Sequence, residues 1–248
     1  MSRLGPIAAL GTLLAFAPTA QAATIAIHGS TTVSAAILVP HKAAIEKASG
    51  ETLDIVANGS GRGLADLLGG KAEMAMISAP LATEVAAANA KAPGSIDAAK
   101  LVGHQIGETL VAFVVNPANP VTALTLAQVT GILSGKLTNW TELGGTDLPI
   151  VVVAATRGDG VRSAVEGRLL DGGSILSQAR EMPNASQIAQ VTAQLPAAFG
   201  VTSAASVRLG VTVIKTDQPI GQPLILVTIG PATPDAAKVI DAATAAAH

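Results

Sequence analysis

The first stretch whose residue types suggest chemistry is Gly-Ser-Thr-Thr at residues 29–32, between a short apolar run and a helical pattern. The first turn of a helix leaves backbone N–H groups unpaired and carries about half a positive charge, so oxygen-rich anions bind there. The hydroxyls of Ser30, Thr31 and Thr32 would add donors without adding charge. The alternative is N-capping, because serine and threonine are favoured at any helix start.

A second, glycine-rich loop at residues 58–63 again lies between an apolar run and a helical pattern. Its three glycines permit positive φ angles and a close approach of the backbone to a ligand, which a simple cap does not need. The spacing Gly-x-Gly-x-Gly matches neither the phosphate-binding P-loop nor the dinucleotide-binding pattern. We therefore expect Ser60 and Gly61 to contact an anion other than a nucleotide.

A third loop, residues 154–163, contributes Arg157 and leads into another expected helix. The planar guanidinium suits tetrahedral oxyanions and stays charged. Three helix N-termini supply at most about +0.5 each, and with one arginine they roughly balance a dianion, so no metal or other cofactor is needed. The alternative is a surface turn in which Arg157 pairs with Asp159.

The elements that position these loops alternate between apolar runs and helical patterns, which is typical of an α/β fold with a largely parallel sheet. Strands are expected at 24–28, 52–57, 74–77, 108–116, 149–155, 199–202, 210–215 and 224–229. Helices are expected at 33–48, 63–68, 82–92, 124–134, 161–170 and 184–194, with a last one from Thr233. The Asn-Pro-Ala-Asn-Pro breaker at 116–120 and the late strands predict two lobes with a return of the chain to the first.

The composition of the chain excludes several classes of protein. Arg3 precedes an uncharged apolar run and small residues up to Ala22, so residues 1–22 are expected to be a cleaved secretory signal. The chain has no cysteine, which excludes disulfides and a lipid-modified N-terminal cysteine. The apolar run after Arg3, of about 14 residues, is shorter than the roughly 20 that a membrane helix needs, and no second stretch of about 18 apolar residues follows it. No basic run indicates a nucleic-acid partner. Aromatic residues are too few to stack a ligand, so we expect hydrogen bonds and charge to hold it.

An enzymatic interpretation finds little support. The histidines are scattered at His28, His41, His104 and His248. Only His28 lies near candidate nucleophiles, and a buried or capping histidine is favoured there because no Gly-x-Ser-x-Gly motif accompanies it. The chain also offers no cysteine and no paired histidines for a zinc site. We therefore expect a binding protein rather than an enzyme.

Other single residues are expected to be structural. Trp140 is assigned to the core of the second lobe rather than to a ligand platform. Asp54, Asp66 and Glu73 are expected to be solvated surface charges. Glu108 either orders the hinge or contacts the ligand, and the structural role is favoured because a bare carboxylate beside an anion costs energy.

The chain resembles the phosphate-binding proteins of bacterial ABC importers, within the two-lobed periplasmic binding protein superfamily. The resemblance rests on "GSTTV", "NGSGRGLADLLGGKAEMAMISAPL", "LVAFVVNPANPV", "LTLAQVTGILSGKLTNWTELGG", "LPIVVVAATRGDGVRSAVEGRL" and "QPLILVTIG". It implies a type II fold in which each lobe is a mixed, mostly parallel sheet flanked by helices, with the ligand cleft between the lobes. Lobe 1 is expected to comprise 23–111 plus 205–248, and lobe 2 to comprise 112–204.

The resemblance also implies a periplasmic protein that closes on phosphate and docks on an inner-membrane ABC permease. We expect it to be a monomer. By position, Thr31 and Thr32 fall in the first anion loop, Ser60 in the second, and Arg157 with Asp159 in the third. The full set of expected ligand-binding residues is Ser30, Thr31, Thr32, Ser60, Gly61, Ser78, Arg157, Asp159, Gly160 and Ser163.

Three departures from the family pattern affect the ligand. Ser78 stands where phosphate-binding relatives often carry an aspartate that accepts the proton of hydrogen phosphate. The family has a Ser-Gly-Thr after the arginine of the third loop, and this chain lacks it. An ungapped alignment places residues 161–163 there, whereas an alignment on the downstream "RSAVE" places residues 159–161 there. In both alignments hydroxyl donors are lost. Arg62 lies inside the glycine loop. Two alternatives therefore stay open: a binding protein for sulfate, molybdate, tungstate or a small carboxylate, and a non-transport sensor or adhesion protein.

Overall fold

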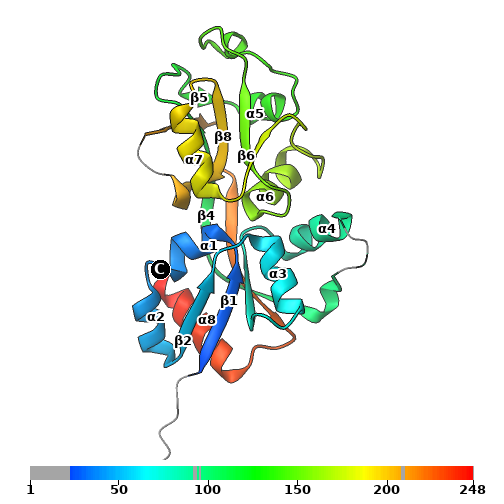
Figure 1. Cartoon of the computed structure of the whole chain (residues 1–248), viewed down its shortest axis with the longest axis vertical. Coiled ribbons are helices and arrows are strands. Elements are labelled where there is room, and N and C mark those ends of the chain that lie inside the picture. The colour runs from blue at the N-terminus through cyan, green and yellow to red at the C-terminus, as the bar shows by residue number, and fades with distance from the viewer. Residues whose placement is uncertain (1–22, 92–93, 95, 208–209, 248) are drawn as a thin grey trace, which may run out of the picture.

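The computed structural model describes residues 23–91, 94, 96–207 and 210–247. It has two lobes stacked along the long axis of the molecule (Figure 1). The main sheet has the strand order β2-β1-β3-β11-β4-β8-β6-β7. Strand β4, Leu101–Val115, belongs to both lobes, because β11 pairs with its first part and β8 with its last. The predicted two-lobed α/β fold is confirmed, whereas the expected signal at 1–22 lies outside the described residues.

The first lobe, in the lower half of Figure 1, carries the first two of the expected anion loops. Its strands besides β4 are β1 (Thr24–Gly29), β2 (Thr52–Val56), β3 (Met74–Ile77) and β11 (Gly221–Ile229). Its helices are α1 (Thr31–Val33), a π-helical turn (Ser34–Leu38), α2 (Lys42–Ser49), α3 (Ser60–Leu68), α4 (Leu81–Lys91), a 3₁₀ turn (Ala98–Lys100) and α8 (Pro234–Ala246). Strands β1, β2 and β3 are parallel, so the loops after them leave the same edge of the sheet.

The second lobe carries the third loop. Its strands besides β4 are β6 (Val151–Ala155), β7 (Arg180–Met182), β8 (Ala198–Ser203) and β9 (Thr212–Val213), with a separate pair β5 (Ala123–Leu124) and β10 (Lys215–Thr216). Its helices are α5 (Leu126–Leu133), α6 (Gly160–Leu169), α7 (Ala185–Gln194) and 3₁₀ turns at Trp140–Leu143 and Ala204–Ser206. Strand β6 lies parallel to β7 and β8. In the described part of the chain, no helix has both the length and the apolar character of a membrane span.

The chain passes between the lobes at two places. Strand β4 changes partner between Leu110 and Val111. The chain returns from the second lobe to the first later than the sequence indicates. Strand β9 still pairs with the end of β4, and β10 pairs with β5. Residues 212–216 thus join second-lobe strands, although the sequence places all of 205–248 in the first lobe. We place the return at Gly221, since backbone pairing rather than turn signals decides which sheet a strand joins.

Two elements differ from their expected extent. The single helix expected at 33–48 is instead α1, the π-helical turn and α2. Pro40 has no backbone N–H to continue the helical hydrogen bonds, and the chain leaves the helical conformation at His41 before α2 begins at Lys42, although Val39 itself keeps helical dihedral angles. Strand β4 begins at Leu101, well before the expected residue 108, because β11 pairs with a segment whose side chains are largely exposed.

Each lobe has its own core. In the second lobe the rings of Phe113 and Phe199 stack with centroids 5.6 Å apart, and Trp140 packs against Phe199. Trp140 is fully buried, and its Nε1 donates a hydrogen bond to the Ala197 carbonyl at 3.0 Å. The prediction that Trp140 is a core residue is confirmed. In the first lobe, α2 with α8 and α3 with α4 contribute to separate clusters.

Candidate functional site

Ser30 joins the first loop to the end of β3. Its Oγ accepts hydrogen bonds from the N–H groups of Thr32 and Val33 at 3.2 and 3.3 Å, so it caps α1 as the alternative interpretation predicts. The same hydroxyl donates to Ser78 Oγ at 2.9 Å. The Thr31 hydroxyl is buried and has no hydrogen-bond partner among the described residues. The first loop therefore combines a cap with a link between two strand ends.

Close packing explains the glycines of the second loop. Gly59 has a φ of +99°, which favours glycine. A Cβ on Gly63 would overlap the carbonyl oxygen of His28 and lie 2.5 Å from the Cα of Gly29. Helix α3 thus rests directly on the end of β1. This contact fixes Ser60, the first residue of α3, at the sheet edge where β1 and β3 end.

His28 has a structural partner rather than a nucleophile. Its Nδ1 lies 2.9 Å from Asp66 Oδ2, and Asn58 Nδ2 donates to the same oxygen at 2.9 Å. These hydrogen bonds, from His28 first and Asn58 second, lower the pKa of the Asp66 carboxyl. The expectation that Asp66 is a solvated surface charge is wrong, because folding brings the three side chains together from separate elements.

The start of α6 lies against the first lobe. Asp159 caps the helix, with its Oδ1 accepting a hydrogen bond from the Val161 N–H at 2.9 Å. A Cβ on Gly160 would overlap Ser78 Oγ and lie 2.7 Å from Ser60 Oγ. Only a glycine lets the first turn of α6 approach these two hydroxyls so closely.

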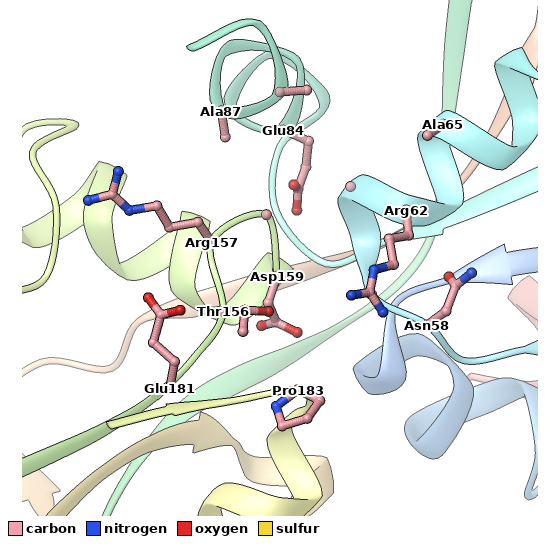
Figure 2. A pocket seen from close by; sticks show the side chains of 14 residues that line it. Asn58, Arg62, Ala65, Glu84, Ala87, Thr156, Arg157, Asp159, Glu181 and Pro183 are labelled. Carbon is pink, nitrogen blue, oxygen red and sulfur yellow. The ribbon is translucent and has the colours of Figure 1, made fainter. Parts of the chain in front are cut away.

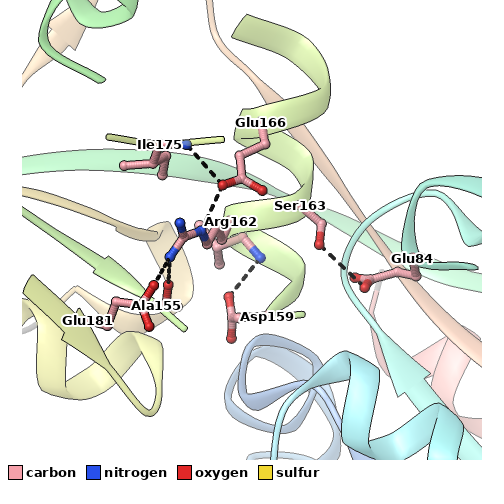
Figure 3. A network of polar contacts seen from close by, with 9 residues as sticks. Glu84, Ala155, Asp159, Arg162, Ser163, Glu166, Ile175 and Glu181 are labelled. Carbon is pink, nitrogen blue, oxygen red and sulfur yellow. Dashed lines mark hydrogen bonds and ion pairs between the residues drawn. The ribbon is translucent and has the colours of Figure 1, made fainter. Parts of the chain in front are cut away.

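Polar contacts between described residues of the two lobes hold the lobes together. The N–H of Gly61 donates to the Gly158 carbonyl at 2.8 Å. Ser163 Oγ donates to Glu84 Oε2 at 3.5 Å, a contact drawn in Figure 3. Ser163 and Glu84 are both buried. The lobes are therefore closed on one another at the ends of β1, β2 and β3.

The structure brings together part of the expected ligand-binding set. We define the cleft cluster as Ser30, Ser60, Ser78, Gly160 and Ser163. Thr31 and Thr32 follow Ser30 in α1, the Gly61 N–H is used in the contact between lobes, and the Asp159 carboxylate caps α6. Arg157 is exposed and extends away from Asp159 in Figure 2. The Arg157 guanidinium, which we expected in the binding site, therefore lies at the exposed edge of the cleft and outside the cleft cluster.

A cavity of about 590 Å³ opens beside the cleft cluster and is walled by both lobes. Asn58, Arg62 and Glu84 line it from the first lobe, and Arg157 and Glu181 from the second (Figure 2). The Arg62 side chain is exposed. This volume lies in the range of small-molecule sites. Arg62 and Arg157 share this cavity with the carboxyl groups of Glu84, Asp159 and Glu181, so its lining contains groups of both charges.

Sequence reasoning missed the role of Arg162. This arginine is 2% exposed, and its Nε donates to Glu166 Oε1 at 2.8 Å. Its Nη1 donates to the Ala155 carbonyl at 2.9 Å and to Glu181 Oε1 at 2.7 Å, which ties α6 to the ends of β6 and β7 (Figure 3). The four-residue spacing to Glu166 is a visible signal of one partner. Nothing in the sequence indicates Glu181 as a partner, or the burial of Glu84.

The buried carboxyl of Asp159 makes stability depend on pH. Burial raises its pKa to about 6, although hydrogen bonds from the N–H groups of Val161 and Arg162 act in the opposite direction. The folded state therefore holds this proton more tightly than the unfolded chain does. The resulting contribution to stability is fully present below about pH 4 and is lost as the pH rises through about 6.

Asp159→Asn is expected to raise the free energy of unfolding at about pH 8 by at most about 3 kcal/mol. Asparagine removes the buried charge and still caps a helix. At about pH 4 the two proteins should be nearly equal, because the wild-type carboxyl is then largely protonated. Urea unfolding at the two pH values measures the difference. A difference that is the same at both values would contradict the assignment of the raised pKa to burial.

Comparison with known proteins finds relatives named for phosphate. The chain is 27% identical over 177 residues to the phosphate-binding protein PstS of Bacillus subtilis (strain 168), covering 71% of this chain and 56% of that protein's length. A Clostridium perfringens protein, named as a phosphate ABC transporter substrate-binding protein and solved with bound phosphate, is 26% identical at a TM-score of 0.75, covering 88% and 92% of the two chains. An ABC-type phosphate transport receptor from Vibrio cholerae has the same fold, with a TM-score of 0.65, 24% identity, and coverage of 89% and 93%.

The family assignment rests on a longer match. A family model described as PBP superfamily domain matches residues 15–245. The two lobes, the strand β4 that they share and the closed cleft between them agree with this match. The chain therefore belongs to the PBP superfamily.

Proposed function

We propose that this protein is an extracytoplasmic solute-binding protein that captures phosphate or a similar tetrahedral oxyanion and delivers it to an ABC importer. The cleft cluster carries the proposal, because hydroxyls from three loops of the first lobe meet the start of α6 from the second. The similarity to the Bacillus subtilis and Clostridium perfringens proteins, both named for phosphate, supports the same class of ligand. Binding and release, rather than a catalytic step, make up the proposed activity.

Buried hydroxyls without protein partners support this proposal. Ser60 is fully buried, and in the described part of the chain its hydroxyl has no hydrogen-bond partner. The Thr31 hydroxyl is in the same state. Leaving a buried polar group unsatisfied costs about 1–3 kcal/mol, so such groups are rare in the absence of a ligand or water. An oxyanion bound in the cleft would accept hydrogen bonds from these hydroxyls and from those of Ser78 and Ser163.

Closure of the lobes couples capture to delivery. The contacts of Gly61 with Gly158 and of Ser163 with Glu84 form only when the lobes are together. A ligand that touches both lobes is bound more tightly in the closed state and shifts the equilibrium toward it. We propose β4 and the return at Gly221 as the hinge. In this proposal the closed monomer, released into the periplasm by cleavage after residue 22, docks on an inner-membrane permease.

Isothermal titration calorimetry with phosphate, sulfate, molybdate and tungstate tests the proposal. We expect phosphate to bind, and Ser60→Ala to weaken it roughly 10- to 100-fold, because a hydrogen bond to a charged group contributes about 1.5–3 kcal/mol. Ser134→Ala is the matched control, since Ser134 is exposed at the end of α5 in the second lobe. Binding of a different anion alone would favour the alternative ligands. No heat and no thermal shift with any anion would favour a sensor or adhesion protein.

A further inference from the structure

Glu51 places a buried carboxylate at the start of β1, the opposite end of that strand from the cleft. It is 6% exposed, although a glutamate is rarely buried without a partner. Its Oε2 accepts a hydrogen bond from the Ala23 N–H at 2.8 Å, and its Oε1 accepts one from Lys238 Nζ on α8 at 3.1 Å. The two carboxylate oxygens therefore serve different partners, one on the main chain and one on a side chain.

The backbone fixes both Glu51 and Ala23 in these positions. The Glu51 N–H donates to Ser49 Oγ at 3.2 Å, and Gly50 between them ends α2 with a φ of +77°. The Thr52 N–H donates to the Ala23 carbonyl at 2.9 Å, so Ala23 extends the pairing of β1 with β2. The Ala23 side chain packs against the core cluster to which α2 and α8 contribute. The Ala23 nitrogen is thus held beside the carboxylate by the sheet and the core as well as by Glu51.

The charges around Glu51 do not balance while Ala23 contributes only an amide. Lys238 is shared, because its Nζ also donates to Asp235 Oδ1 at 2.8 Å. These hydrogen bonds, to Asp235 first and Glu51 second, raise the pKa of the Lys238 amino group, so it stays charged well above neutral pH. Two carboxylates then share one ammonium group, and an uncompensated charge is costly where it is buried. A second positive charge at the Ala23 nitrogen would make the cluster neutral.

Hydrolysis of the Ala22–Ala23 peptide bond would supply that charge. The small residues Ala20 and Ala22 have the spacing that a secretory signal peptidase recognises, and this places the cleavage after Ala22 independently of the fold. The reaction consumes one water and leaves a carboxyl group on Ala22 and an amino group on Ala23. An α-amino group has a pKa of about 7.7–8.0, so it takes up a proton at about pH 7. A neutral N–H donor becomes an ammonium group at the same atom.

We propose that Glu51 is the binding site for the α-ammonium group of a mature chain that begins at Ala23. Its hydrogen bond to the ammonium group is charge-assisted, and such bonds are roughly twice as strong as those between neutral groups. Removal of the signal then completes the charge balance at the start of β1, the strand whose other end leads into the first anion loop. This inference does not depend on the ligand that the cleft binds.

Thermal unfolding at about pH 7 and about pH 10 tests the proposal, on the protein exported from the full-length chain and on its Glu51→Gln variant. Pairing raises the pKa of the α-amino group above its unfolded value, so its contribution to stability is present below about pH 8 and is lost as the pH rises through the folded pKa. We expect the unfolding midpoint of Glu51→Gln to lie about 4–8 °C below that of the wild type at about pH 7, and about 2–4 °C below it at about pH 10, where only the pair with Lys238 remains. An intact-mass measurement of the same samples gives the first residue, which should be Ala23.

Charged groups on the neighbouring elements have other partners or face solvent. Glu46 of α2 accepts hydrogen bonds from Lys42 Nζ and the Leu53 N–H. Glu73 accepts one from the N–H of Ala26, an interior residue of β1. The exposed groups on α2, β2 and α8 are Lys47, Asp54 and Asp241. Glu73→Gln is therefore the matched control, because it removes a carboxylate from a β1 amide that cannot titrate, and its effect should be the same at both pH values.

A chain that keeps residues 18–22 in front of Ala23 controls for the charge itself. Its Ala23 nitrogen stays a neutral amide, so Glu51→Gln in that chain should lower the midpoint equally at both pH values. In the exported protein, an effect of Glu51→Gln that is equal at both pH values would overturn the proposal, as would a mature chain that begins at another residue. The calorimetry described above tests anion binding separately, so failure of this inference leaves the proposed function standing.

Discussion

Gly160→Ala is expected to weaken anion binding roughly 10- to 100-fold without unfolding the protein, since overpacking a tight contact costs about 1–3 kcal/mol. The new methyl group would overlap Ser78 Oγ and lie 2.7 Å from Ser60 Oγ and 3.1 Å from Glu84 Oε1. Ser78 is buried and bonded to Ser30, so it cannot turn away without losing that hydrogen bond. The lobes must therefore separate slightly, and the closed state is disfavoured.

Calorimetry with phosphate gives the loss of affinity, and small-angle scattering with saturating phosphate gives the compactness of the bound state. We expect the variant to stay more open than the wild type. Gly167→Ala on the same helix is the control, because its Cβ would meet only Thr83 Cγ2 at an ordinary 3.6 Å. That variant should bind and close normally. Wild-type affinity in Gly160→Ala would show that the start of α6 does not approach the ligand.

Trp140→Ala is expected to lower the free energy of unfolding by about 3–5 kcal/mol, the usual cost of removing a large buried aromatic side chain. Trp140 is fully buried, packs against Phe199, and donates a hydrogen bond to the Ala197 carbonyl. The indole belongs to the cluster that joins α5, β4, β6 and β8. Its loss leaves a cavity in the core of the second lobe.

Urea unfolding followed by far-ultraviolet circular dichroism measures this effect, because Trp140 is the single tryptophan of the chain and its fluorescence disappears with it. Trp140→Phe is the matched control. It keeps an aromatic ring in the core, and the Ala197 carbonyl still accepts a hydrogen bond from the Val151 N–H at 3.0 Å. We expect it to lose less than half as much stability. A loss below about 1 kcal/mol in Trp140→Ala would contradict the assignment of Trp140 to a tightly packed core.

Several elements could be predicted from the sequence because their causes are local. Helix α8 begins at Pro234, where Thr233 caps the chain and proline occupies the first turn. Strand β3 occupies the predicted residues 74–77. Trp140 lies in the core because a large apolar ring is costly to expose. Such features depend on neighbouring residues or on hydrophobicity alone.

The cleft cluster could be predicted only in part. Ser30, Ser60 and Ser78 follow parallel strands, and the ends of parallel strands meet at one edge of a sheet, so their convergence is readable from the order of elements. The same reasoning put Arg157 among them, but its side chain extends to the rim. Which way a long side chain on a loop points depends on contacts that the order of elements does not specify.

The sequence by itself determined the alternation of strands and helices, the two lobes and the hydroxyl-bearing loops, since each follows from local pattern and turn chemistry. Only the tertiary structure decided that β4 starts at Leu101, that Arg162 is buried, and that Glu84 faces the cleft. The physical reason is that these outcomes depend on partners distant in the chain. Glu84 and Ser163 are 79 positions apart, and no local pattern records which residues closure of the lobes will bring together.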